Sequence, residues 1–189
     1  MQRRKALNIM GLLVGYGIIG ESLLLSGCQP TPKNVARLFT TKDVALLDDI
    51  AETILPATNT PGARESKLGA FICMMATDCY PPATQKIFID GLAQLNKTCE
   101  QQYGHQFIDC KAAEKESILK KMDDETIKYL AVKKPTDPPQ FFWLLKDLTI
   151  FGFFTSEPGA TKVLRYIAIP GKYLGDVPYK KGDKAWATY

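Results

Sequence analysis

Cysteine and histidine, the side chains that most often carry out covalent or metal chemistry, are few in this chain. The sequence has five cysteines and a single histidine, His105. A serine hydrolase needs an imidazole base, but His105 lies in a loop-like segment without a GxSxG motif. The absence of a CxxC pair argues against a Cys/His zinc site. Since GxGxxG, GxxxxGK[ST] and CxxCH motifs are also absent, we expect no catalytic residue, metal or cofactor in this chain.

Cys28 ends a motif with a different chemistry, the attachment of lipid. Arg3 and Arg4 lie in a basic N-terminus, and residues 7–25 form a mostly apolar stretch. The following Leu25-Ser26-Gly27-Cys28 resembles the bacterial lipobox, in which the cysteine receives diacylglycerol before cleavage. We therefore expect residues 1–28 to be a signal peptide, and the mature chain to be lipid-anchored at Cys28 on the periplasmic side of the cell envelope.

The route and destination of export are less determined by the sequence. The Arg3-Arg4 pair resembles a twin-arginine signal, but Ala6-Leu7 replaces the usual Phe-Leu, so general secretion remains open. An uncleaved N-terminal anchor is the alternative to processing at Cys28. Gln29 is not the aspartate associated with inner-membrane retention, which favours the outer membrane.

The remaining cysteines, at positions 73, 79, 99 and 110, permit three disulfide connectivities in an oxidising compartment. We expect Cys79 to pair with Cys99, because each lies near one end of a predicted helix whose neighbours can fold back on it. Buried free thiols are the alternative.

Charge offers no argument for nucleic acid as a partner. The net charge of +4 includes three cations of the signal, so the mature chain is close to neutral. Adjacent acids such as Asp48-Asp49 and Asp123-Asp124 point in different directions on a helix. We interpret them as solvated surface charge and not as an acid/base pair.

Periodicity predicts a mainly α protein, a single-domain bundle of about five to six helices with an irregular, partly extended C-terminal tail. Residues 29–39 are expected to be a flexible tether, and residues 40–189 the folded domain. The expected helices start at Thr40 or Thr41 and end before Pro56, then cover 63–77, 83–103, 112–122 and 140–153. A short helical turn through Ile127 and Leu130 and another at 156–160 are also expected.

The helix over 140–153 has more large apolar residues than one buried stripe requires. It is either central to the bundle or shared with a partner. The tail beyond Thr155 is rich in glycine, proline and tyrosine, and we expect it to lie across the bundle surface.

Three groups of segments resemble the small subunit (subunit 3, or gamma) of the gluconate 2-dehydrogenase family. They are residues 46–56, residues 60–63 and, most specifically, residues 152–161, continued by 164–166 and 169–173. Together they span most of the mature chain. The family often has a cysteine near its final Pro-Gly-x-Tyr segment, which this chain lacks at 175–178, and the lipobox at Cys28 is not universal.

The resemblance implies a noncatalytic accessory subunit that exports, stabilises and membrane-anchors a periplasmic dehydrogenase. The implied partner is a GMC-type flavoprotein large subunit, which binds FAD and oxidises a sugar, sugar acid or polyol. Electrons would pass to a cytochrome c subunit or to a quinone. The alternative is a free-standing lipoprotein that binds a sugar or an envelope component in a cleft lined by tyrosines of the tail.

We place the expected partner interface on the segment 153–159 and on the tail. Its residues are Phe153, Phe154, Thr155, Ser156, Glu157, Gly159, Tyr166, Pro170, Gly171 and Tyr173. These residues could equally be internal structural signatures.

Overall fold

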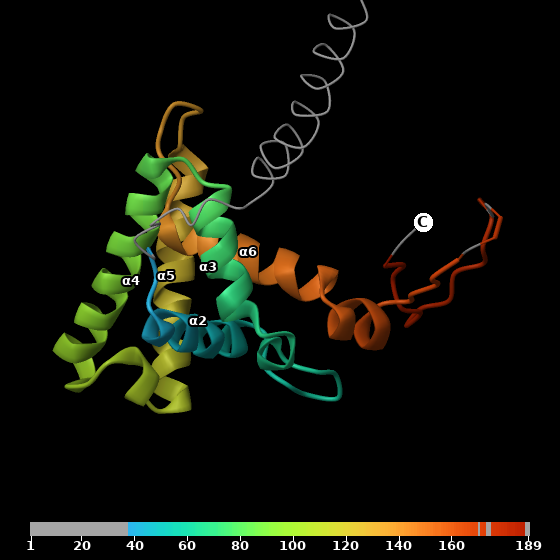
Figure 1. Ribbon diagram of the computed structural model, residues 1–189, viewed down its shortest axis with the longest axis horizontal. Coiled ribbons are helices and arrows are strands. Elements are labelled where there is room, and N and C mark those ends of the chain that lie inside the picture. The colour runs from blue at the N-terminus through green and yellow to red at the C-terminus, as the bar shows by residue number, and fades with distance from the viewer. Residues whose placement is uncertain (1–37, 170, 173–174, 188–189) are drawn as a thin grey trace, which may run out of the picture. The chain divides into compact units, whose positions relative to one another are not determined.

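Helices make up most of the part of the chain that the computed structural model describes, residues 38–169, 171–172 and 175–187. The α-helices are α2 (Thr41–Ile54), α3 (Leu68–Asp78), α4 (Pro82–Tyr103), α5 (Ala112–Val132) and α6 (Phe141–Thr155). Shorter helices are η1 (Ala63–Ser66), η2 (Phe107–Asp109) and the π-helical η3 (Gly159–Val163). These helices confirm the predicted mainly α bundle (Figure 1). The expected signal peptide, Cys28, Pro170 and Tyr173 lie outside the described residues.

Local sequence explains where the first helix begins. The Thr40 hydroxyl accepts a hydrogen bond from the Asp43 amide at 3.3 Å, and the Asp43 carboxylate accepts one from the Thr40 amide at 2.7 Å. This capping box satisfies amides that α2 itself cannot bond. Buried apolar residues then recur at helical spacing, at positions 46, 47, 50 and 51, and turn one face of α2 to the core.

The second helix differs from its prediction, because residues 63–77 do not form one continuous helix. Lys67 has a left-handed backbone, with φ of 51°, and separates η1 from α3. The Asp48 carboxylate of α2 accepts a hydrogen bond from the Gly69 amide at 2.6 Å, so it caps α3 as a residue of α3 itself normally would. A Cβ on Gly69 would lie 2.2 Å from the Val44 carbonyl oxygen. The break thus lets α3 start directly against α2.

The fourth helix is also longer than predicted, since α5 continues past residue 122 to Val132. Thr126 is buried, and its hydroxyl donates to the Met122 carbonyl at 2.8 Å. Asp123 forms an ion pair with Lys146 of α6 at 2.7 Å. The expected end is wrong because the burial of Thr126 and the ion pair of Asp123 with α6 stabilise the helix beyond residue 122.

Helix α6 lies at the centre of the packing, in contact with α2, α3, α4 and α5 (Figure 1). Its core face includes Phe141, Phe142, Leu145, Leu148 and Phe153, all buried. Two glycines permit close approach to it. A Cβ on Gly91 of α4 would lie 2.1 Å from the Phe141 ring, and one on Gly152 would lie 2.6 Å from the Phe71 ring. The core is therefore built around one apolar helix that several neighbours approach closely.

None of the helices described here is long and apolar enough to cross a membrane.

Replacing Asp48 tests the cap that α2 provides for α3. We expect Asp48→Ala to lower the free energy of unfolding by about 1–2 kcal/mol, because the Gly69 amide loses its acceptor. Asp48→Asn keeps an acceptor oxygen and should retain most of the stability. The exposed Asp124→Ala is the control, with a change within about 0.5 kcal/mol. Equal losses for Asp48→Ala and Asp124→Ala in urea titrations would contradict the assignment.

Candidate partner-binding surface

Helix α6 has an exposed apolar face in addition to its core face. At about 100° per residue, positions 143, 147, 150, 151 and 154 lie on one side of the helix, and all of them except Asp147 are apolar. Phe151 is 51% exposed and Phe154 is 37% exposed, and Trp143 and Ile150 are exposed to a similar degree. We call Trp143, Ile150, Phe151 and Phe154 the α6 outer face. The apolar residues over 140–153 are too many for one buried stripe because they form both the core face and the outer face of α6.

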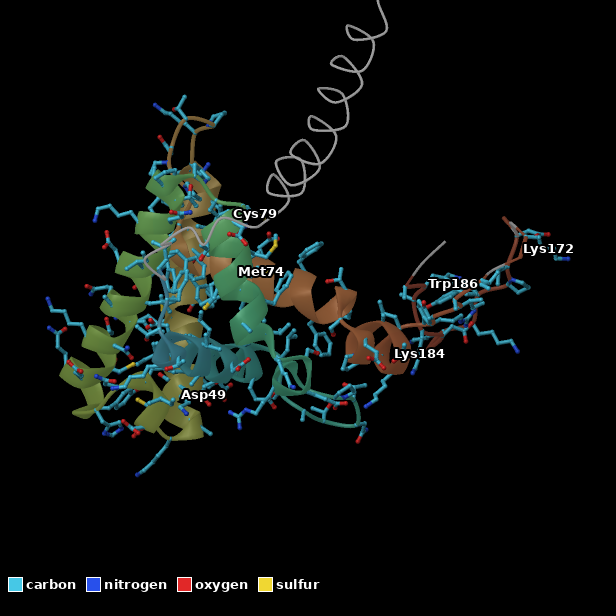
Figure 2. All side chains as sticks on the ribbon, viewed as in Figure 1. Asp49, Met74, Cys79, Lys172, Lys184 and Trp186 are labelled. Atoms are coloured by element: carbon cyan, nitrogen blue, oxygen red, sulfur yellow. The ribbon has the colours of Figure 1, made fainter. Side chains whose placement is uncertain are left out.

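Helix α3 extends this apolar surface. The Phe71 ring lies 6.1 Å from the Phe151 ring, measured between ring centroids. Met74, three residues after Phe71 on α3, is 52% exposed (Figure 2). Met74 and the outer-face residues Trp143 and Ile150 were not among the predicted interface residues. Trp143 and Ile150 could have been predicted from the sequence, because helical spacing places them on the same side of α6 as the predicted Phe154.

Three predicted interface residues take part in the turn that ends α6. The Ser156 hydroxyl lies 2.6 Å from the Phe153 carbonyl, accepts from the Gly159 amide at 3.2 Å and contacts the Ser66 hydroxyl at 2.9 Å. A Cβ on Gly159 would lie 1.9 Å from the Phe153 carbonyl oxygen, so the turn admits only glycine. The Phe153 side chain is buried. Phe153, Ser156 and Gly159 thus shape the turn that ends α6, which agrees with the alternative that they are structural signatures, and their role at an interface stays a prediction.

The other predicted interface residues have accessible positions. Phe154, Thr155, Glu157, Tyr166 and Gly171 are exposed. Only Phe154 among them lies on the α6 outer face. Their role at an interface stays a prediction.

The C-terminal tail folds back on itself. Arg165 exchanges backbone hydrogen bonds with Ala185 at 2.7 Å and Ala187 at 3.0 Å, and its guanidinium lies 4.7 Å from the Trp186 ring centroid (Figure 2). Ile169 is 86% exposed. These contacts join two parts of the tail to one another, and the expected placement of the tail across the bundle surface stays a prediction.

The acids of α2 are structural and not solvated as predicted. Asp49 is largely buried and forms ion pairs with Arg64 at 2.8 Å and with Lys115 of α5 at 2.6 Å. Glu52 accepts hydrogen bonds from the amides of Ala57 at 3.1 Å and Arg64 at 2.8 Å. Sequence could not reveal these roles, because the cations and amides come from other elements.

The predicted Cys79–Cys99 disulfide is not formed. Cys79 is an exposed free thiol that follows α3, with its sulfur 3.8 Å from the Met75 sulfur (Figure 2). It precedes the start of α4, whereas Cys99 is buried in the last turns of that helix, about 25 Å further along the axis. A disulfide requires Cα atoms within about 7 Å. The prediction failed because both cysteines border the same long helix at opposite ends.

His105, Cys110 and Glu114 lie together at the start of α5, with their candidate ligand atoms within 4.8 Å of one another. His105 Nε2 lies 3.4 Å from the Glu114 carboxylate, which also accepts from the Lys111 amide at 2.8 Å. The pKa of Glu114 is lowered, chiefly by the hydrogen bond from the Lys111 amide and also by His105. The carboxylate thus caps α5, and we assign the cluster a structural role.

Comparison with known proteins is informative at the level of the family. Residues 41–171, more than half of the chain, match the family described as gluconate 2-dehydrogenase subunit 3. Neither the curated proteins nor the solved structures give a match. The match begins with α2 and includes the turn that ends α6, the two regions whose motifs carry the resemblance. The chain therefore belongs to the gluconate 2-dehydrogenase subunit 3 family.

Proposed function

We propose that this chain is a noncatalytic accessory subunit of an FAD-dependent, GMC-type dehydrogenase of sugars, sugar acids or polyols. It accompanies the flavoprotein large subunit through export, stabilises it and anchors it through lipid on Cys28. Family membership is consistent with an accessory subunit of a dehydrogenase complex. The sequence lacks cofactor motifs, so FAD and the oxidation belong to the partner, which passes electrons to a cytochrome c or quinone.

The observation that carries the proposal is the α6 outer face. It presents three aromatic side chains and an isoleucine from one side of a single helix. Aromatic residues are enriched at protein interfaces, where burial of their large apolar area contributes most of the binding free energy. Met74 of α3 adds a flexible apolar side chain to the same surface. A partner that covers this surface removes it from water.

The alternative, a free-standing sugar-binding lipoprotein, has less support in the geometry. A depression lined by Leu38, Phe39, Asp43, Leu92 and Asn96, among others, has a cavity volume of about 160 Å³. Ligand sites for small molecules are usually about 300 Å³ or larger. The lining is not formed by tyrosines of the tail.

The direct test is a pull-down of the tagged chain from its native membrane in mild detergent, followed by an absorbance spectrum. We expect a yellow complex that contains an FAD-binding large subunit. A colourless, solitary chain of the processed mass would contradict the proposal and favour the free-standing lipoprotein.

Substitutions on the α6 outer face locate the interface. We expect the double variant Phe151→Asp and Phe154→Asp to fold normally and to lose most of the co-purifying flavoprotein, with affinity reduced by more than about tenfold. The control is Ile127→Asp, which places the same charge on an exposed apolar residue of another helix, α5, where Ile127 is 59% exposed. Equal recovery of flavoprotein with both proteins would place the interface elsewhere.

Replacing Cys28 separates anchoring from partner binding. We expect Cys28→Ser to move the chain and its flavoprotein from the membrane fraction to the periplasmic soluble fraction, because no acyl chains are attached. The complex itself should persist, since residue 28 precedes the segment matched to the family. Unchanged membrane association of Cys28→Ser would overturn the assignment of the anchor.

A further inference from the structure

Two cysteines that the sequence analysis did not pair lie in contact in the folded chain. Cys99 is in the last turns of α4, and Cys110 lies between η2 and α5. Cys99 is fully buried and Cys110 is 6% exposed. The Cys99 and Cys110 side chains are close enough for each to influence the pKa of the other, and the Cys110 thiol donates to the Gln106 carbonyl at 3.4 Å.

The loop between the two cysteines is held by contacts that do not involve sulfur. Gly104 has φ of 83°, a left-handed conformation that ends α4 and turns the chain. The Phe107 ring is fully buried, and the Phe107 amide donates to the Asn96 side chain at 3.2 Å. Lys115 of α5 donates to the Ile108 carbonyl at 3.0 Å. The fold therefore brings the two sulfurs together as a consequence of backbone packing.

We propose that Cys99 and Cys110 form an intrachain disulfide when the chain reaches an oxidising compartment. Two S–H bonds break and one S–S bond forms, and two protons are released. The two electrons reduce the disulfide of an extracytoplasmic thiol–disulfide oxidoreductase, or glutathione disulfide in vitro, to the dithiol. The inference rests on the predicted export and is independent of the proposed dehydrogenase partner.

Burial makes this bond structural and not catalytic. Desolvation raises the pKa of Cys99 to about 12 and also raises the pKa of Cys110. Thiolates are the reactive form in exchange, so the folded dithiol is a poor nucleophile at neutral pH. Exchange takes place before the loop packs, and the packed loop then shields the bond from reductants.

Peptide mapping gives a direct test, because the chain supplies its own control. Residues 98–111 form one tryptic peptide that contains Cys99 and Cys110, and residues 68–86 form another that contains Cys73 and Cys79. The protein is taken from its native envelope, or is refolded from denaturant in a glutathione redox buffer, and is then unfolded and alkylated with iodoacetamide without reductant. We expect peptide 98–111 to be unalkylated and lighter than its dithiol by two hydrogens. Peptide 68–86 should carry two carbamidomethyl groups.

Two results of the mapping would overturn the proposal. One is full alkylation of peptide 98–111 in both preparations, and the other is a cross-link between peptides. A third contrary result is alkylation after treatment with a chelator alone, because a metal ion held by Cys110, His105 and Glu114 would then be what protects the thiols.

Thermal unfolding provides an independent readout. A cross-link that closes a loop of about 12 residues should raise the unfolding midpoint of a domain of this size by about 5–10 °C. We expect the natural chain and Cys79→Ser to have a midpoint lower by this amount when they are unfolded and refolded in the presence of reductant. Cys110→Ser should have a lower midpoint that does not respond to reductant. Equal responses of Cys110→Ser and the natural chain would contradict the disulfide.

Discussion

The carboxylate of Asp48 against the Gly69 amide is the contact on which the rest of the domain depends. This hydrogen bond holds the chain in place just after η1, so that α3 starts directly on α2. With α3 in that position, Leu68 and Phe71 reach Gly152, whose missing side chain makes room for them. The position of α6, and therefore of its outer face, follows from this packing of α3 against α2 and against Gly152.

The segments that resemble the family form one structural unit in the fold. Asp49 and Glu52 of α2 hold the loop that contains Gly62 and Arg64. Ser66 contacts Ser156, and Glu65 forms an ion pair with Lys162 of η3. Residues within or next to motifs that lie about a hundred positions apart are therefore joined by hydrogen bonds and ion pairs. Their residues mainly build the scaffold, and the aromatic side chains of the α6 outer face lie exposed beside them.

Helix α6 serves both the core and the surface. Its buried face supplies the largest apolar side chains at the centre of the bundle, whereas its outer face leaves Phe151 and Trp143 partly in water. An exposed aromatic stripe is unfavourable for an isolated chain, because apolar area in water costs free energy. In a subunit, burial of the same stripe against a partner would contribute to the free energy of binding. This fits membership of a family of dehydrogenase subunits.

The mainly α class and the ends of α2 and α4 could be predicted from the sequence alone. They follow from local signals: the capping box at Thr40, the left-handed glycine at Gly104 and the period of the apolar residues. The family was indicated by the resemblance of the motifs over 46–63 and 152–161 and is shown by the family match. Which acids are buried, which motif residues are internal and which cysteines lie close together became visible only in the folded chain. Such properties depend on residues distant in sequence, such as Lys115 beside Asp49. Local propensity contains no information about those distances, so the contacts emerge only when the helices pack.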